Sequence, residues 1–541
     1  MSAECYPIST LPHSTRLYAD FLDLGAAPAA SPLRTWYGSQ SERPATPNPA
    51  LADALSQQAK LFGASPEQLA SIEQLRTGAR AIVTGQQVGL FGGPLLTLLK
   101  AVTAVARARQ ASTQSGVPHV PIFWLATEDH DLAEVDQVTL PTREGLETLT
   151  LGLRSHDTEV GAIPLGARVE PLLAQVRELL AHAPICDLLE RCYTPATTLG
   201  TAFAQLLSAL FAPHGLIVMD ASTRAFHALG APMLRAAIER AEELESALLA
   251  RTAELERAGY SAQVLVRPGA SLLFLLHART GERQPLRRLP DGSWKAGQQA
   301  FTSSALLEIL DATPERLSPN ALLRPLFQDT ILPTAAYIGG PAEIAYFAQC
   351  GALYERIFDL GSGRKRGSIT PILPRFSATL TTPADRALLA RYELTLADLW
   401  SAATPDVLAQ RLGARAMPIE GKRKIAAAGN AMDAELSALT EYLASTDPDL
   451  GRSALVSASK MRYQMNRLRR MAARFELEKN TSLGKQANAL MRNLYPKAHL
   501  QERILGGIAL LAQAASPEDL ISTLIAAAAD RCPGHVVLPI D

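Results

Sequence analysis

The sequence predicts an α/β protein built on a parallel sheet and followed by an all-helical region. Apolar runs at Ala81–Val83 and Pro121–Ala126 flank a helical stretch at Pro94–Gln110, which gives strand, helix, strand over residues 81–140. Two parallel strands joined by one helix form a βαβ unit, the elementary piece of a doubly wound sheet. After residue 383 the strand signals vanish, and apolar residues recur at helical intervals.

The segments around this unit continue the mixture of helices and strands. Residues 1–80 are predicted to be helical after a Pro-rich start, with a loop around Arg43–Pro49. Pro94 opens the helix of the βαβ unit, because a residue in the first turn needs no free N–H. Helices are expected over 167–212, and Gly215–Asp220 is expected to be another buried strand that ends on an acid.

A small β-rich insertion is predicted around residues 260–305. Gln263–Val266 and Ser271–Leu276 flank Arg267–Ala270, which is the pattern of a hairpin, and Pro290–Trp294 adds a turn. The insertion would lie within the α/β domain.

A second strand-to-helix turn follows the insertion. The run Thr334–Ile338 leads into Gly339-Gly340-Pro341 and a helix that we expect to end near Phe358. This repeats the design of Thr84–Pro94, so two helix N-termini are expected to face one crevice. The core is predicted to span 1–380, with a domain boundary near Thr381–Pro383.

Apolar residues within 385–480 recur at heptad-like spacing, which predicts two long helices. Ser445–Asp449 breaks the pattern and would fold the helices into an antiparallel pair. Because the stripes exceed what one pair needs to bury, we expect a homodimer through this region. The segment 481–541 is expected to pack back on the core. The stripe residues are Ile425, Met432, Leu436, Leu439, Leu443, Met461, Met465, Leu468, Met471 and Phe475.

Composition favours a soluble, cytoplasmic protein. The net charge of -1 gives no global attraction to nucleic acid or to acidic membranes. No stretch reaches the roughly 18 apolar residues needed to span a bilayer, and the N-terminus lacks the pattern of a secretory signal. The 5 cysteines include no Cys-x-x-Cys pair, which fits a reducing cytosol and argues against a zinc ribbon or a disulfide scaffold. They are Cys5, Cys186, Cys192, Cys350 and Cys532.

The turn at Thr84–Pro94 is the first candidate site. Glycines let a backbone turn tightly and approach a phosphate, and the following helix supplies free N–H groups. Neither Gly-x-Gly-x-x-Gly nor a P-loop is present, and a purely structural turn is the alternative. The candidate nucleotide-binding residues are Gly85, Gln86, Gln87, Gly89, Gly92 and Gly93.

The second candidate site is an acidic quartet directly after the strand Pro121–Ala126. Acids and an imidazole at a strand end can hold a metal or transfer protons, although Asp and Glu also favour helix starts. Asp129 and His130 are the preferred proton carriers, with coordination of a divalent ion as the rival role for Asp129. The candidate catalytic residues are Glu128, Asp129, His130 and Asp131.

Together with Ser318–Tyr346, these two motifs resemble those of the cysteine-adding enzymes of bacillithiol synthesis. The resemblance runs almost end to end, as far as Leu500–Arg503. It implies a Rossmann-like core with inserted connecting segments and a C-terminal antiparallel coiled coil that dimerises. The implied reaction is the ligation of L-cysteine to the amine of glucosaminyl-malate, with ATP, and with Mg²⁺ as a further expectation. Activation of the cysteine carboxylate as an adenylate or as a phosphate both remain open, and no metal ligands are assigned.

The malate end of such an acceptor carries two carboxylates and needs cationic donors. Arg324 and Arg375 are the leading candidates, because guanidinium pairs bidentately with carboxylate; an ion pair within the fold is the alternative for each. Cys350 is interpreted as buried core and Arg364–Arg366 as a surface loop. The candidate substrate-binding residues are Asn320, Arg324, Gly339, Gly340, Glu343, Tyr346 and Arg375.

Two other functions stay open at this point. A nucleotidyltransferase-like enzyme could keep the fold and act on another amino acid or sugar. A non-catalytic coiled-coil dimer could keep the fold and leave the acidic quartet idle.

Overall fold

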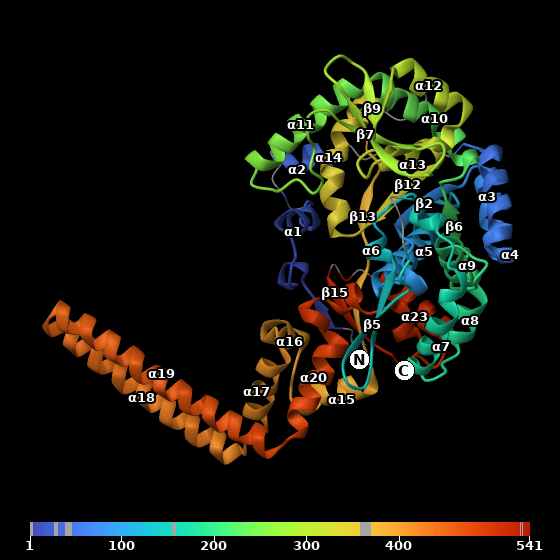
Figure 1. The fold of residues 1–541 in the computed structure, drawn as a ribbon. Helices are drawn as coiled ribbons and strands as arrows, with labels where there is room; N and C mark the ends of the chain where they lie inside the picture. Colours follow the sequence, from blue (N-terminus) through green and yellow to red (C-terminus); the bar gives the residue numbers. More distant parts are fainter. Residues whose placement is uncertain are drawn as a thin grey trace. The chain divides into compact units, whose positions relative to one another are not determined.

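A computed structural model of the chain describes residues 4–25, 27, 31–37, 46–153, 158–357, 369–530, 532 and 534–540. The chain divides into two compact units (Figure 1). Unit 1 contains Met1–Leu140, Glu147–Thr379 and Glu502–Asp541, and unit 2 contains Pro141–Leu146 and Leu380–Gln501. No helix of the described residues combines the length and apolarity needed to cross a membrane.

A parallel five-stranded sheet forms the centre of unit 1, with the strand order β13-β12-β2-β3-β6. The chain builds β2, β3 and β6 outward on one side and then returns to add β12 and β13 on the other. This is the Rossmann order, and its direction reverses between β2 and β12. The predicted α/β fold is therefore confirmed. The strands are β2 (Arg80–Gln87), β3 (His119–Ala126), β6 (Ile217–Asp220), β12 (Thr334–Gly339) and β13 (Ile372–Pro374).

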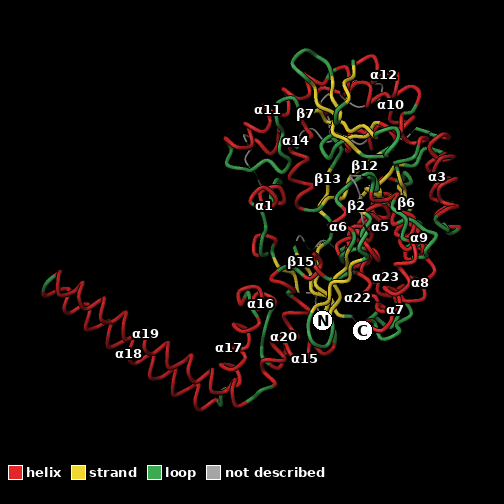
Figure 2. Tube along the Cα trace, viewed as in Figure 1, coloured by secondary structure: helices red, strands yellow, loops and turns green. Residues whose placement is uncertain are grey.

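Helices cover both faces of this sheet, which explains why its strands are continuous apolar runs. On one face Ile82 packs with Ala104 and Ala108 of α5 (Leu95–Ser115). On the other face Ala81 and Val83 join a core shared with α3, α4, α10 and α14. The helices around the core, shown in Figure 2, are α1 (Arg16–Leu22), α2 (Pro32–Trp36), α3 (Pro49–Leu61), α4 (Pro66–Arg76), α7 (Val169–Leu179), α8 (Ile185–Cys192), α9 (Leu199–Leu210), α10 (Arg224–Glu239), α11 (Ala241–Arg257), α13 (Arg324–Ile331), α14 (Pro341–Ile357), α21 (Gln501–Ile504), α22 (Gly507–Leu511) and α23 (Pro517–Ala529).

The insertion is an antiparallel sheet of order β10-β9-β8-β7-β11, completed by α12 (Ser303–Ala312). The predicted hairpin is wrong in its first strand, because Gln263–Val266 is not a strand and β7 pairs with β8. The Val264 N–H donates to Oε1 of Gln349 at 3.0 Å, and Nε2 of Gln349 donates to the Val264 carbonyl at 2.9 Å. The Gln349 side chain thus replaces a strand partner at Val264. The strands are β7 (Ala270–Leu276), β8 (Arg283–Arg288), β9 (Trp294–Ala296), β10 (Gln299–Phe301) and β11 (Leu317–Pro319).

A third sheet joins the two ends of the chain. β1 (Glu4–Tyr6) pairs antiparallel with β15 (His535–Pro539), which lies beside β14 (Ser377–Thr381). A disulfide connects Cys5 to Cys532. The sequence argued against a disulfide scaffold and did not indicate this single bond, which forms because strand pairing between the two ends brings together sulfurs 527 residues apart in the sequence. The predicted loop at Arg43–Pro49 and the loop at Arg364–Arg366 lie partly or wholly outside the described residues, as does Phe358.

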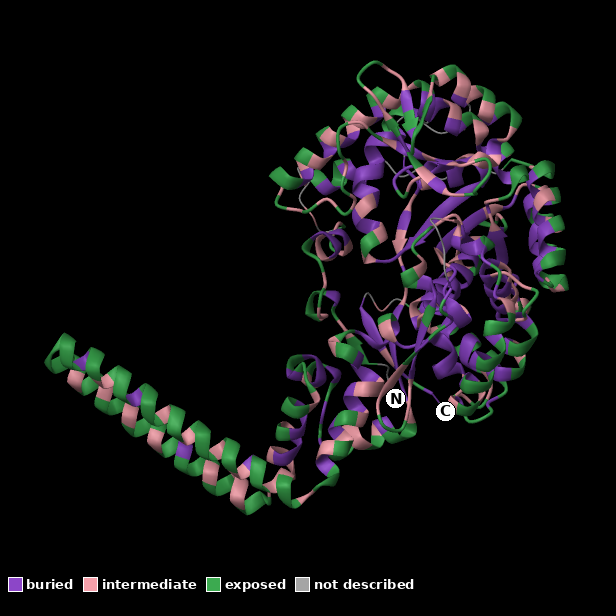
Figure 3. Cartoon of the chain, in the orientation of Figure 1, coloured by how far each residue is buried: buried purple, intermediate pink, exposed green. Residues whose placement is uncertain are grey.

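Unit 2 is helical and contains the predicted antiparallel pair, α18 (Ile419–Thr446) and α19 (Pro448–Lys479). Asp447 forms the break, and its carboxylate accepts from Asp449 and Leu450 at 2.8 Å. Figure 3 shows how much of both helices is exposed. The other helices of this unit are α15 (Pro383–Arg391), α16 (Leu396–Ala402), α17 (Pro405–Ala416) and α20 (Ser482–Leu494). Its short segment Pro141–Leu146 begins with the last residue of β4 (Gln137–Pro141) and ends with the first residue of β5 (Leu146–Thr150); α6 (Leu132–Val135) precedes β4.

Candidate functional site

A cavity of about 410 Å³ opens at the carboxyl ends of β2, β3 and β12. This is the point where the strand order reverses, and open α/β sheets bind their ligands there. Gly85, Gln86 and Gln87 line it from β2, and the first turn of α14 lines it from the other side. The remaining lining residues are Leu96, Lys100, Trp124, Ala126, Asp129, Glu134, Arg324, Tyr337, Gly340, Tyr346, Arg375 and Arg503.

Lys100 ties the two sides of the cavity together. Its ammonium donates to the Gly85 carbonyl at 2.7 Å and to Oε1 of Gln86 at 2.9 Å, and it forms an ion pair with Glu343. Burial lowers the pKa of Lys100, and the Glu343 carboxylate opposes that shift. Lys100 is not among the site residues predicted from the sequence. A lone lysine inside the apolar run Leu95–Val105 is nevertheless an unusual pattern that could have indicated a buried, paired lysine.

Glu343 collects donors from three elements. The Gly340 N–H donates to its carboxylate at 2.7 Å and the Tyr337 hydroxyl at 2.5 Å, in addition to Lys100. Burial opposes its ionisation, but Lys100 and the Gly340 N–H hold the pKa of the carboxyl below its ordinary value. Glu343 is therefore an ionised, fully engaged anchor at the N-terminus of α14, where a negative charge is favoured.

Arg324 projects into the cavity with neutral partners. Its guanidinium donates to Oε1 of Gln328 at 3.1 Å and to the hydroxyls of Tyr337 and Tyr346 at 3.2 and 2.9 Å. The ring of Tyr337 also lies 5.2 Å from the guanidinium carbon. Because these hydrogen bonds run to uncharged groups, the positive charge of Arg324 is available to an anion in the cavity.

Arg375 is held differently, by a buried ion pair with Glu502. Ser377 donates to the same carboxylate at 3.0 Å and the Ala378 N–H at 3.1 Å. Burial opposes ionisation of Glu502, but Arg375 and the Ala378 N–H hold the pKa of Glu502 below the ordinary value. The alternative stated for Arg375, an ion pair within the fold, is present here, and Arg375 still forms part of the cavity wall.

Among the acidic quartet, Asp129 is the member that lines the cavity. Its Oδ2 accepts from the Gln87 amide at 2.5 Å and its Oδ1 from the His130 N–H at 2.7 Å, and its side chain stays 32% exposed. The His130 ring lies 6.0 Å from that of Phe274, and Asp131 is exposed at the start of α6. Nδ1 of His130 lies 3.6 Å from Oδ1 of Asp129, so Asp129 and His130 stay together, and of these two only Asp129 lines the cavity.

Glu128 belongs to a second, buried cluster. It contacts Nε2 of His227 at 2.9 Å, while Nδ1 of His227 lies 3.1 Å from the Pro314 carbonyl. With Glu128 ionised both partners are acceptors, an arrangement that favours hydrogen on both ring nitrogens and hence the cationic form of His227. Burial lowers the pKa of His227, but Glu128 outweighs it and the net shift is upward. Nearby, burial and the Glu128 charge raise the pKa of Glu159 to about 8.

The glycine turn lies beside the cavity, and its backbone donors are used within the protein. The N–H of Gly89 bonds the Gln87 carbonyl at 3.0 Å, that of Gly93 bonds the Leu90 carbonyl at 3.0 Å, and that of Gly92 is 3.2 Å from the Tyr193 hydroxyl. A Cβ on Gly89 would lie 2.9 Å from Cα of Gly93, so the turn needs glycine for close packing. Only Gly85, Gln86 and Gln87 of the candidate nucleotide residues line the cavity.

Asn320 and Gly339 also have internal roles. Oδ1 of Asn320 accepts from the N–H groups of Leu322 and Leu323 at 3.0 Å, just before α13, and the Gly339 carbonyl accepts from the Arg375 N–H at 2.9 Å. Neither residue lines the cavity. Among the candidate substrate-binding residues, Arg324, Gly340, Glu343, Tyr346 and Arg375 do line it.

The cavity suits a phosphate or a carboxylate through its side chains. Arg324 and the exposed Arg503 can reach an anion, whereas the glycine turn offers no spare N–H among the contacts above. No group of three or more His, Cys, Asp or Glu in the described part of the chain could hold a metal ion. Mg²⁺ commonly uses one or two carboxylates together with substrate phosphates, and Asp129 and Glu134 could supply those.

Comparison with known proteins gives two family matches that together span most of the chain. Residues 31–360 match the N-terminal Rossmann-like domain of bacillithiol biosynthesis BshC, and residues 378–539 match its C-terminal coiled-coil domain. A protein of Koribacter versatilis with the provisional name cysteine ligase BshC is 41% identical over 99% of this chain and 100% of its own length. Proteins of the same name from Solibacter usitatus and Geobacillus kaustophilus are 37% and 30% identical, over 95% and 91% of this chain and 95% and 92% of their own lengths.

Proposed function

The chain belongs to the BshC family of bacillithiol biosynthesis, and from this premise we propose that it is a ligase that joins the carboxyl group of L-cysteine to the amine of glucosaminyl-malate. ATP would activate the cysteine carboxylate, as an acyl-adenylate or an acyl-phosphate. The observation that carries the proposal is the cavity at the switch point of the sheet, which is lined by guanidinium groups and by the Asp129 carboxylate.

Two of the cationic side chains around the cavity are ion-paired within the described part of the protein, and two are not. Lys100 is neutralised by Glu343 and Arg375 by Glu502, so these two pairs hold the walls in place. Arg324, whose bonds run to neutral groups, and Arg503, exposed at the rim, are then left for the substrate. Two guanidinium groups match the two carboxylates of a malate moiety, since each pairs with one carboxylate.

Asp129 is the proposed proton acceptor. An amine is mostly protonated at neutral pH and must lose a proton before it attacks an activated carboxyl group. Asp129 is held by Gln87 and by the His130 N–H but keeps part of its carboxylate open to the cavity. A positioned base of this kind typically contributes about 10²–10⁴-fold to the rate. When bound, Mg²⁺ with ATP would neutralise phosphate charge, with Asp129 and Glu134 as the available carboxylates.

The proposal includes a homodimer formed through α18 and α19 in the cytoplasm. Several large apolar side chains on these helices are exposed, which a single antiparallel pair leaves uncovered. The exposed residues are Ile419, Leu439, Tyr442, Leu450, Leu455, Val456, Met461, Tyr463, Leu468, Met471 and Phe475.

The test is a direct assay of the purified chain with ATP, L-cysteine and glucosaminyl-malate. We expect bacillithiol by mass spectrometry, together with either pyrophosphate or ADP, which identifies the mode of activation. Asp129→Asn should remove the product, whereas the matched control Asp131→Asn changes an exposed carboxylate two residues away and should retain it. Product from serine or glycine at the same rate as from cysteine would instead support an enzyme for another amino acid.

A further inference from the structure

The two cysteines of the Cys5–Cys532 disulfide are more exposed to solvent than the other three cysteines. Cys186, Cys192 and Cys350 are buried free thiols. Burial raises the pKa of all three, that of Cys192 to about 11, so they form little thiolate at neutral pH. Cys5 is exposed and Cys532 is half-buried. Thiol chemistry of the folded chain is therefore expected at the disulfide.

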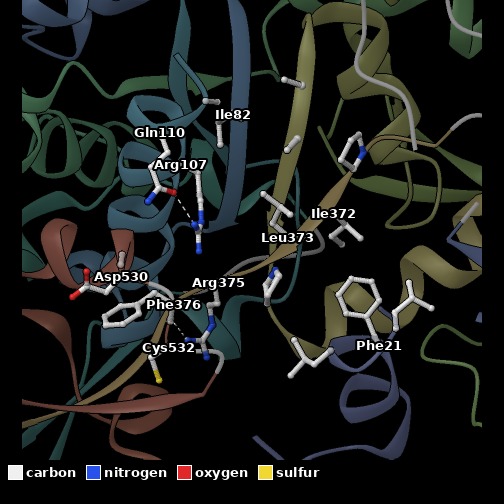
Figure 4. A pocket seen from close by; sticks show the side chains of 18 of the residues that line it. Phe21, Ile82, Arg107, Gln110, Ile372, Leu373, Arg375, Phe376, Asp530 and Cys532 are labelled. Carbon is white, nitrogen blue, oxygen red and sulfur yellow. Dashed lines mark hydrogen bonds between the residues drawn. The ribbon is translucent and has the colours of Figure 1, made fainter. Parts of the chain in front are cut away.

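Cys532 lines a second cavity, of about 760 Å³, and Arg375 lines both this cavity and the candidate site. Figure 4 shows the labelled side chains of Arg107, Gln110, Asp530 and Cys532 on one side of this cavity, and those of Phe21 and Ile372 on the other. Arg107 donates to Oε1 of Gln110 at 2.7 Å. The lining of this cavity thus includes the Arg107 guanidinium and the Asp530 carboxylate besides Cys532, and a zwitterionic amino acid requires one charge of each sign.

We propose that the Cys5–Cys532 bond is a reversible exchange site for a small amino-acid thiol that enters this cavity. The thiolate attacks Sγ of Cys532, the Cys5–Cys532 bond breaks, and Cys5 leaves as a thiolate that takes up the proton lost by the incoming thiol. A second thiol molecule then attacks the mixed disulfide, which releases the oxidised small-molecule disulfide and leaves both cysteines reduced. The direction follows from position, because Cys532 lines the cavity and Cys5 is open to solvent, where a leaving thiolate is hydrated.

A transient bond is compatible with the cytoplasmic location proposed above. Disulfides in reducing compartments are usually catalytic or redox-sensing and are seldom permanent staples. The strand that follows Cys532 also contacts the support of the candidate site, since His535 of β15 lies 2.8 Å from Ser377, which shares Glu502 with Arg375. The thiol exchange itself does not depend on the ligation proposed above, and the test below measures sulfur chemistry only.

The experiment uses the oxidised full-length chain, L-cysteine as the probe thiol and iodoacetamide to trap released thiolate. Peptide mapping after acid quench is expected to show Cys532 joined to one cysteine and Cys5 alkylated, with Cys186, Cys192 and Cys350 unmodified. Arg107→Gln should slow opening by L-cysteine about two- to fivefold, the range that a solvent-open ion pair supplies. It should leave opening by cysteamine unchanged, because cysteamine has the aminothiol group without the carboxylate.

Three outcomes would overturn the proposal. Cysteine attached to Cys5 with Cys532 alkylated would reverse the direction of attack. Opening only in denaturant would make the bond a permanent staple. If Arg107→Gln slowed disulfide opening by L-cysteine and by cysteamine equally, Arg107 would not recognise the carboxylate of the thiol. Each outcome can occur with an active or an inactive ligase, so failure here is distinguishable from failure of the proposed reaction.

Discussion

The buried histidine of β15 gives a pH dependence that can be worked out from its contacts. Nδ1 of His535 lies 2.8 Å from Oγ of Ser377, and Nε2 lies 2.8 Å from Oγ1 of Thr379. Ser377 already gives its hydroxyl hydrogen to Glu502, so it accepts from Nδ1–H. The neutral ring then accepts from Thr379 through Nε2. His535 is therefore assigned as neutral, with its hydrogen on Nδ1.

Burial lowers the pKa of His535 to about 4, while the Glu502 charge opposes and the Arg375 charge reinforces that shift. The unfolded chain takes up the proton near the ordinary value of 6.5, and the folded chain does so only near 4. Stability from this residue is thus complete above pH 6.5 and is lost as the pH falls toward 4. At about 1.4 kcal/mol per pH unit, the loss amounts to about 3 kcal/mol.

The assay is urea unfolding at a series of pH values from about 7.5 to 4, for the unmodified chain and for His535→Gln. The glutamine amide can serve both hydroxyls but does not titrate. The excess stability of the unmodified chain over the variant should shrink by about 3 kcal/mol across this interval. A difference between the two chains that stays constant over the whole interval would refute the neutral assignment, because it would mean that the folded and unfolded pKa values of His535 are equal.

Three further predictions concern the site and the coiled coil. Arg324→Lys keeps the charge but loses the planar fork between Tyr337 and Tyr346, so the KM for glucosaminyl-malate should rise by the equivalent of about 1.5–3 kcal/mol; an unchanged KM would remove Arg324 from acceptor binding. Asp129→Asn should abolish turnover in steady-state assays, and partial rescue by excess Mg²⁺ would indicate a metal ligand and no rescue a base; near-normal activity would reject both roles. Leu468→Glu, at a residue 58% exposed on α19, should yield monomers in sedimentation without loss of helix, and a persistent dimer would place the interface elsewhere.

The parts of the fold that were predictable from sequence are those with a strong local signal. The βαβ unit, the strand before Gly339 and the long helical pair each have an apolar period that matches one element. Gln263–Val266 shows where this fails. The run is apolar enough for a strand, but a single glutamine from α14 satisfies both backbone groups of Val264. A side chain 85 residues away leaves no trace in the local pattern.

The acidic quartet shows the same limit at the site. Sequence indicates four ionisable groups after a buried strand, but not which of them face a common cavity. Glu128 is turned to His227, 99 residues further along the chain, and Asp129 to Gln87. Neighbours in the sequence therefore enter different clusters, because successive side chains at a strand end point in different directions.

The two arginines predicted to bind the substrate show the same limit of the sequence. Arg324 and Arg375 look alike in sequence, each with an internal ion pair as the alternative to substrate binding. Glu502 decides between them, from 127 residues beyond Arg375, because it neutralises that guanidinium inside the protein. Breaking such a buried pair by removing one charge costs about 3–5 kcal/mol, so a substrate carboxylate gains little by competing with Glu502. Arg503, the residue next to Glu502, lies exposed at the rim of the same cavity. Of these two adjacent residues, Glu502 neutralises Arg375, and Arg503 supplies a guanidinium group that can contact the substrate. Recognition of a dicarboxylate should therefore depend on Arg503 and Arg324.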